Sequence, residues 1–324
     1  MTNETQTRTF LQMNSSPHMH SPVTTKHIML DVIIALIPTL IWGIYAFGIR
    51  TLGVVAVSVC SCVVFEYLYR KIAKKRDATG DLSAVVTGIL LAFSLPSNIP
   101  LWMVISGDFF AIVIVKQLYG GIGKNIVNPA LAARVFLFMS FSSELSSKYT
   151  EPHTDVIATA TPLASLQKGT LPAYSLENIF YGEIPGCIGE ISVTLIVLGG
   201  LYMLYRKVIT WHIPFSYLAT VAIISLIFPQ GDFTGIQFML YELCSGGLML
   251  GAFFMATDYV TSPVTPLGRV IYGIGCGLIT MFIRYFGYPE GVSFAILIMN
   301  LFALVLDRIT MPKKFGSKTV ISQN

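Results

Sequence analysis

Charged residues are scarce in this chain of 324 residues. Asp, Glu, Lys and Arg make up 12% of the sequence and hydrophobic residues 54%, and the mean hydropathy is +0.69. Soluble globular domains carry about 25% charged residues, so the composition excludes an ordinary soluble domain and predicts a polytopic membrane protein. The net charge of +4 does not indicate nucleic-acid binding, because the basic residues fall in short clusters between apolar runs.

Metal and phosphate signatures are also lacking. The cysteines offer no disulfide framework and no second pair for a zinc or iron–sulfur site, so no metal is predicted and all five are interpreted as small core residues: Cys60, Cys62, Cys187, Cys244 and Cys276. The glycine-rich run 120–125 fails the P-loop pattern, because Leu118 stands at the first glycine position and Asn125 replaces the hydroxyl residue. We interpret it as a turn, with Asn125 or Asn128 near the N-cap of the next helix.

No cleavable signal peptide is visible in residues 1–27, which are polar, so we expect the first apolar run to direct insertion. Spans of about 20 residues are needed to cross a bilayer, and ten runs are predicted to do so: 28–49, 51–69, 82–96, 99–117, 125–141, 188–205, 211–229, 238–256, 268–286 and 290–308. The third is short and the eighth is interrupted by Gly246-Gly247 and Gly251. A short helix and an interrupted helix at matching places in the two halves of a chain are typical of duplicated folds. The expected fold class is therefore all-α, with two inverted five-helix repeats.

Lysine and arginine are distributed unevenly between the predicted loops. With the N-terminus inside, sixteen of the 21 fall on the cytoplasmic side, one (Arg134) lies within a span, and four lie outside, namely Arg50, Lys148, Lys168 and Arg284. The positive-inside rule then predicts that both termini are cytoplasmic and that the long loop 142–187 is extracytoplasmic.

This outer loop contains Asp155-Val156-Ile157-Ala158-Thr159-Ala160-Thr161. The segment resembles the flavinylation signal Asp-x-x-[Ser/Thr]-Gly-Ala-Thr, in which the last Thr carries FMN through a phosphoester bond. Asp155, Ala160 and Thr161 match, whereas Ala158 and Thr159 depart from the pattern. A solvated turn is the alternative interpretation of this segment when it is taken alone.

Three longer stretches resemble one family, the D subunit of the Rnf electron-transport complex, which is related to the B subunit of the sodium-pumping NADH:quinone oxidoreductase. They are Asp81–Phe93, Lys116–Asn125 with Asn128-Pro129-Ala130, and Ile184–Glu190, and the resemblance covers residues 24 to 310. It implies covalent FMN on Thr161, with Asp155, Thr159 and Ala160 as its motif. It also implies a second flavin, riboflavin, among the helices near the run 120–125.

The resemblance further implies partners and a location. The partners are a G-type flavoprotein subunit, A/E-type membrane subunits, soluble B/C-type iron–sulfur subunits, membrane lipid and an FAD-dependent flavin transferase that loads FMN. The complex couples ferredoxin and NAD to a sodium or proton gradient in the bacterial inner membrane. The expected organisation is a cytoplasmic segment 1–27, a first repeat 28–141, a flavin-bearing loop 142–187, a second repeat 188–309 and a cytoplasmic tail 310–324.

Ionisable residues within predicted spans need internal partners, because an unpaired charge in the bilayer is costly. Asp108, Glu66 and Arg134 are such residues. Each is interpreted either as part of a structural ion pair or hydrogen-bond network, or as part of a cation path. Asp108 is the first candidate for that path and Glu190 the second, although Glu190 and Glu242 also fit the membrane interface. Two functions without flavin stay open: an inverted-repeat transporter or channel, and a scaffold for a membrane complex.

Overall fold

The computed structural model describes residues 24–74, 79–146, 149–154, 161–170, 172, 174–231, 233–288 and 290–312. Within these ranges the chain is helical and has no β-strand. The first part comprises α1 (Thr25–Phe47), α2 (Ile49–Ile72), the 3-10 turn η1 (Thr79–Asp81), α3 (Ser83–Phe93), α4 (Leu101–Phe109), the π-helical segment η2 (Phe110–Gln117), α5 (Pro129–Ser140) and α6 (Ser142–Ser146).

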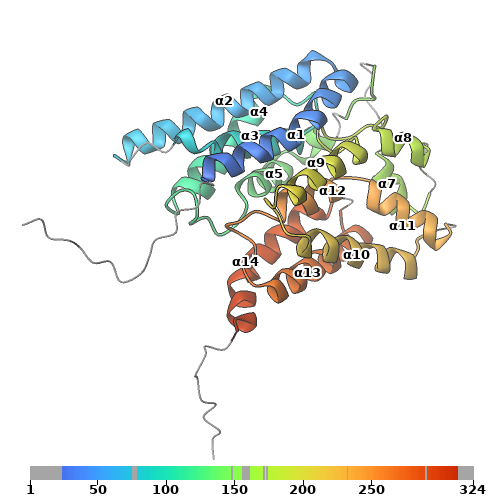
Figure 1. Cartoon of the computed structure of the whole chain (residues 1–324). Helices are drawn as coiled ribbons and strands as arrows, with labels where there is room; N and C mark the ends of the chain where they lie inside the picture. The colour runs from blue at the N-terminus through green and yellow to red at the C-terminus, as the bar shows by residue number, and fades with distance from the viewer. Residues whose placement is uncertain are drawn as a thin grey trace, which may run out of the picture.

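Two short helices follow in the loop, α7 (Pro162–Gln167) and α8 (Leu176–Tyr181). The second part comprises α9 (Val193–Tyr205), α10 (His212–Ile227), α11 (Gly235–Cys244), α12 (Leu248–Leu250), the π-helical segment η3 (Gly251–Met255), α13 (Pro266–Phe286) and α14 (Val292–Thr310). Figure 1 shows α7, α8 and α11 gathered at one end of the bundle.

Four helices, α1, α2, α13 and α14, are long and apolar enough to cross a membrane. A fifth span is added if α11 and the segment Leu248–Met255 count as one, since they are bent by 64° at a short break. That break contains Gly246-Gly247, where the sequence predicted an interruption. Each of the other predicted runs contains a helix, but the count of ten spans stays a prediction.

Several helices begin with the same local chemistry. Asn128, Thr161 and Thr265 each precede a proline, and their side-chain oxygens accept a hydrogen bond from a backbone N–H in the first turn. Proline is favoured at the first helical position because its missing N–H has no helical partner there. Of the two candidates that the sequence offered, Asn125 and Asn128, it is Asn128 that caps α5.

Close backbone contacts hold the bundle together. A Cβ on Gly88 of α3 would lie 3.0 Å from the carbonyl oxygen of Ser58 on α2, and one on Gly277 of α13 would lie 3.1 Å from that of Tyr217 on α10. Contacts between α1 and α9 and between α5 and α14 join the two parts. Apolar side chains remain exposed on the outside, as lipid-facing residues do, for example Leu304 at 70%.

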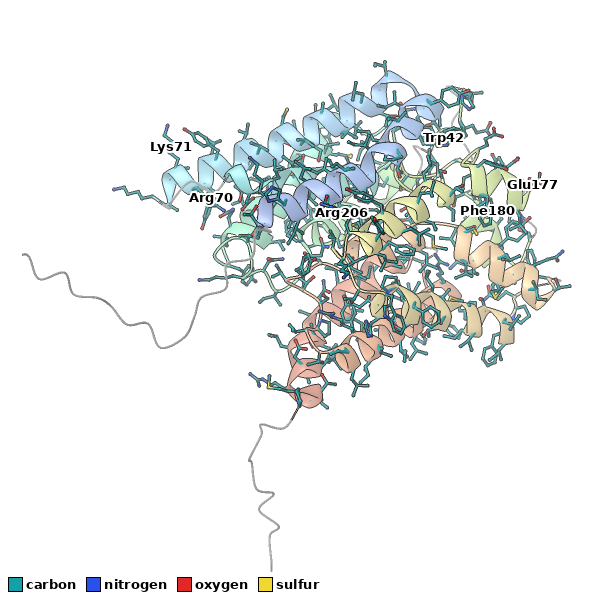
Figure 2. All side chains as sticks on the ribbon, viewed as in Figure 1. Trp42, Arg70, Lys71, Glu177, Phe180 and Arg206 are labelled. Atoms are coloured by element: carbon teal, nitrogen blue, oxygen red, sulfur yellow. The ribbon has the colours of Figure 1, made fainter. Side chains whose placement is uncertain are left out.

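The two ends of the bundle differ in charge. Figure 2 shows Arg70 and Lys71 at one end and Trp42, Glu177 and Phe180 at the opposite end. The basic residues at the end of α2 and the loop helix α8 therefore lie at opposite ends of the bundle.

Candidate functional site

Thr161 caps α7 and is partly buried. Its Oγ1 accepts only a long hydrogen bond, 3.4 Å, from the Ala164 N–H. It borders a small depression of about 20 Å³, together with Tyr149, Leu163, Ile184, Gly246 and the acidic pair Glu190 and Glu290. The rest of the predicted flavinylation motif, including Asp155, Thr159 and Ala160, lies outside the described residues.

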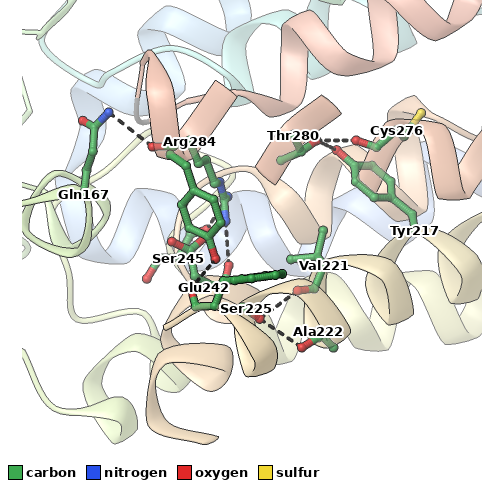
Figure 3. A network of polar contacts seen from close by, with 12 residues as sticks. Gln167, Tyr217, Val221, Ala222, Ser225, Glu242, Ser245, Cys276, Thr280 and Arg284 are labelled. Atoms are coloured by element: carbon green, nitrogen blue, oxygen red, sulfur yellow. Dashed lines mark hydrogen bonds and ion pairs between the residues drawn. The ribbon is translucent and has the colours of Figure 1, made fainter. Parts of the chain in front are cut away.

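Helix α7 is fixed to the rest of the protein on its inner side. Leu163 and Leu166 are buried in an apolar cluster with residues of α8 and α11. Gln167 Nε2 donates to the carbonyl oxygen of Arg284 at 3.3 Å (Figure 3). It also donates to the carbonyl oxygen of Gly287 at 2.7 Å. Thr161 therefore stands at the start of a helix whose position is set by α11 and the end of α13.

Arg284 in turn secures the break between α11 and α12. Its guanidinium bonds the Glu242 carboxylate and donates to the carbonyl oxygen of Ser245 at 3.1 Å (Figure 3). Arg284 and Glu242 are both buried. The sequence placed Arg284 on the outer side and Glu242 near a span end. In the structure the two form a buried pair, and Arg284 satisfies carbonyls that the interrupted helix leaves.

A second buried arginine lies beneath the depression at Thr161. Arg134 of α5 donates to Glu190 at 2.9 Å and also bonds Glu290. Tyr149 OH donates to Glu290 at 2.8 Å. Burial and the neighbouring Glu290 carboxylate raise the pKa of Tyr149 well above its usual value, so this phenol stays protonated.

Cys187, Glu190 and Glu290 lie close enough together to hold a metal ion. Arg134 already bonds both carboxylates, however, and supplies the positive charge that a metal would bring. We therefore interpret the group as an ion-pair cluster. Glu190 is buried in it.

Asp108 of α4 lies fully buried against α2. It accepts hydrogen bonds from Ser58 at 2.7 Å, from Cys62 at 3.2 Å and from Ser61. Cys62 and three other cysteines are buried, as predicted, but Cys60, two positions away on α2, is exposed. The expectation that all five cysteines are core residues was therefore wrong for Cys60.

One helical turn further along α2, Glu66 accepts bonds from three residues: Arg70 at 3.0 Å, Gln117 at 2.7 Å and Lys116 at 3.2 Å. Lys116 also donates to Ser83 Oγ at 2.7 Å. From sequence, Arg70 and Lys116 were cytoplasmic topology signals, yet both are buried in this network. Glu66 and Arg134 have the internal partners that the sequence predicted.

A cavity of about 390 Å³ lies at the end of the bundle predicted to be cytoplasmic. Lys116 at the end of η2 and Phe254 of η3 both border it, and so do Gly123, Asn125 and Asn128 from the glycine-rich run and its helix cap. Its volume is in the range of small-molecule sites, about 300–1,000 Å³. π-Helical segments are frequent at functional sites, and here both of them contribute to one cavity.

Sequence reasoning missed several of these residues. It gave no role to Glu290, Tyr149 or Asp258, which line the two cavities. Glu290 is the first residue of the last predicted span, and a carboxylate at that position was a signal for a partner to Arg134. Tyr149 stands in a polar loop without any pattern that marks it.

Comparison with known proteins gives a consistent result. The model of the NQR2, RnfD, RnfE family matches residues 12–316. The D subunit of the Na(+)-translocating ferredoxin:NAD(+) oxidoreductase complex of Acetobacterium woodii is 48% identical, over 94% of this chain and 95% of the relative. The D subunit of the Proton-translocating ferredoxin:NAD(+) oxidoreductase complex of Clostridium ljungdahlii is 41% identical, over 94% and 96%.

A third relative is the D subunit of the Ion-translocating oxidoreductase complex of Escherichia coli, which is 35% identical over 94% of this chain and 98% of the relative. The matches thus cover nearly the whole length of this chain and of each relative. This agrees with the family motifs on α3, on η2 and in the loop before α9. The chain belongs to the NQR2, RnfD, RnfE family.

Proposed function

We propose that this chain is the membrane subunit of an ion-translocating ferredoxin:NAD oxidoreductase complex, and that it carries FMN esterified through its phosphate to Thr161. The observation that carries the proposal is the setting of Thr161. Its hydroxyl is partly exposed and weakly bonded, while the helix behind it is fixed by Leu166 and Gln167. The hydroxyl can therefore be modified without loss of packing, and the attached group is held in a defined position.

The residues at Thr161 fit a flavin on the outer face rather than inside the protein. The depression of about 20 Å³ is far too small for an isoalloxazine ring, so the ring lies over it and remains open to a partner subunit. A flavin supplies one- and two-electron transfer when bound. A short tether keeps it at roughly millimolar effective concentration beside its partner.

A second flavin, riboflavin, is proposed for the 390 Å³ cavity. Its walls are largely apolar, with Phe254 among them, and a few polar groups converge on it, which is the usual composition of a cofactor site. Lys116 supplies a positive charge next to a ring that becomes more negative on reduction. Asn125 and Ser83 supply groups that can bond its polar edge.

Taken with the predicted topology, the two sites lie on opposite sides of the membrane. We propose ten spans in two inverted five-helix repeats, both termini in the cytoplasm and Thr161 outside the inner membrane. Support comes from the contacts of α1 with α9 and of α5 with α14, which are the corresponding helices of the two halves. Each half also contains one π-helical segment.

The proposed partners follow from this arrangement. A G-type flavoprotein subunit meets the outer face at Thr161. A/E-type membrane subunits meet the lipid-exposed helices, and B/C-type iron–sulfur subunits lie on the cytoplasmic side. An FAD-dependent flavin transferase loads FMN onto the motif that includes Asp155. The pumped cation is left open, because two of the relatives described above carry Na(+) and Proton in their names; Asp108 and Glu190 are the candidates for its path.

In-gel fluorescence of the denatured protein, co-expressed with the transferase, tests the covalent flavin. We expect a fluorescent band in the wild type and in Thr170→Ala, which changes a threonine nine residues away in the same loop, but none in Thr161→Ala. A non-redox transporter or a scaffold predicts no band in any of the three. A band that survives Thr161→Ala assigns the flavin to another residue.

A further inference from the structure

Five carboxylates are buried in the described part of the chain. Four of them have an arginine or lysine within salt-bridge distance: Asp31 with Arg206, Glu66 with Arg70 and Lys116, Glu190 with Arg134, and Glu242 with Arg284. Asp108 is as deeply buried as Glu66 and, among the described residues, has no such cation. An uncompensated negative charge is costly at that depth, so Asp108 requires a positive partner that the described residues do not supply.

The partners of Asp108 are three neutral donors on one face of α2. Ser58, Ser61 and Cys62 are spaced so that their side chains point the same way from the helix. Each serine also has a second acceptor within reach. Ser58 Oγ lies 2.9 Å from the Gly88 carbonyl oxygen, and Ser61 Oγ lies 2.7 Å from that of Val57.

This arrangement satisfies two protonation states without movement of heavy atoms. When Asp108 is ionised, both serine hydroxyls donate to its carboxylate. When Asp108 is neutral, its own O–H donates to Ser61 Oγ, and the Ser61 hydrogen turns to the Val57 carbonyl. Glu66, by contrast, is paired with a fixed cation, Arg70.

We propose that Asp108 is a proton-exchanging group, held as a neutral carboxylic acid in the resting protein. The bond that breaks is its O–H, which yields a carboxylate and H⁺, and the proton returns to the same oxygen atoms from the aqueous phase. The occupant is a proton rather than Na⁺, because Ser58 and Cys62 lie at direct hydrogen-bond distances from the carboxylate. A sodium ion between them would have to spread these groups apart.

The charged groups around Asp108 connect it to the large cavity. On α2, Glu66 lies one turn beyond Cys62, and on η2 Lys116 bonds Glu66. Helix α3 has no charged residue, and Arg134 of α5 is bound to Glu190 and Glu290. Lys116 also borders the cavity. Added negative charge in that cavity attracts the Lys116 ammonium group. The electrostatic potential at Asp108 changes as a result.

Infrared spectroscopy of the purified complex tests this directly. A protonated carboxylic acid has a C=O band separate from the carboxylate bands, and this band shifts in D₂O. At neutral pH we expect one such band to be lost in Asp108→Asn and to be retained, at a shifted position, in Asp108→Glu. Asp31→Asn is the matched control, because Asp31 is buried but paired with Arg206 and should contribute no acid band.

Two results would overturn the proposal. One is an unchanged acid band in Asp108→Asn, and the other is a band in the wild type that disappears when NaCl replaces KCl at constant pH, which assigns the site to Na⁺. The link to electron transfer rests on the proposed function and has its own readout. Reduction with dithionite should change the C=O band of the carboxylic acid in the wild type. The same treatment should produce no such change in Asp108→Asn. If in-gel fluorescence finds no flavin while the resting band is present, the proposed function fails and the protonated Asp108 stands.

Discussion

Arg134 Nη1 donates to Glu190 Oε1 at 2.9 Å and thereby joins α5 to the loop before α9. The other terminal nitrogen bonds Glu290, which lies two residues before α14. One guanidinium therefore neutralises carboxylates from two distant segments, and both carboxylates border the depression at Thr161. The shape of the proposed attachment site depends on this buried pair.

Replacing Arg134 with Met should destabilise the protein by about 3–5 kcal/mol, because Glu190 is left buried without a cation. The measurement is chemical denaturation in detergent. The double variant Arg134→Met/Glu190→Gln is the control and should recover part of the loss, since the uncompensated charge is removed as well. If Arg134→Met unfolds at the wild-type denaturant concentration, the cluster does not contribute to stability.

Gly88→Ala should cost about 1–3 kcal/mol, the usual range for overpacking. The new Cβ would lie 3.0 Å from the Ser58 carbonyl oxygen and from the Val59 Cα, which are backbone atoms of α2 that cannot turn aside. Gly53→Ala, on α2 itself, is the matched control, because no atom lies within 4 Å of its Cβ. Equal midpoints for the two variants in thermal unfolding would contradict the close contact between α2 and α3.

Lys116→Met should remove most of the non-covalent flavin while leaving the covalent flavin in place. Lys116 borders the large cavity, and its loss also removes one partner of Glu66 and of Ser83. Flavin is measured by chromatography after acid extraction, with the in-gel band as the internal reference. Lys71→Met, on the exposed face of α2, should keep both flavins. Unchanged extractable flavin in Lys116→Met would assign the second flavin to another site.

Gln167→Ala should loosen α7 without unfolding the bundle. Two hydrogen bonds to the end of α13 are lost, each worth about 1 kcal/mol. Local opening of residues 162–170 should then be roughly thirtyfold more frequent, which hydrogen–deuterium exchange of that peptide measures. Gln237→Ala changes an exposed glutamine of α11 and should have no effect on the exchange. Identical exchange in both variants would mean that Leu163 and Leu166 alone hold the helix.

The helices and the break at Gly246-Gly247 could be predicted from the sequence, because lipid requires apolar runs and a glycine pair interrupts them. The partners of the charged residues could not. Arg284 and Lys116 look like topology signals in the sequence, since hydropathy records that a charge is present and not which carboxylate it reaches. Only the folded structure shows that Arg284 pairs with Glu242 and that Lys116 pairs with Glu66.

The site was predicted in part. Thr161 follows from its resemblance to a known motif, and Asp108 and Arg134 stood out as charges within apolar runs. The π-helical segments have no composition signal, because they differ from an α-helix only in which carbonyl each N–H bonds. The cavity that Lys116 and Phe254 both line could therefore not be predicted from the sequence. The glycine-rich run 120–125 stood out in the sequence, but it marks only one of the segments that line the cavity.

The most direct test is mass spectrometry of the matured protein after trypsin digestion. Cleavage after Lys148 and Lys168 releases the peptide 149–168, which contains the whole predicted motif. We predict a mass increase equal to FMN less one water, with fragment ions that assign it to Thr161. The same peptide recovered unmodified, from protein made together with the transferase, would contradict the covalent flavin and with it the proposed route of electrons through this protein.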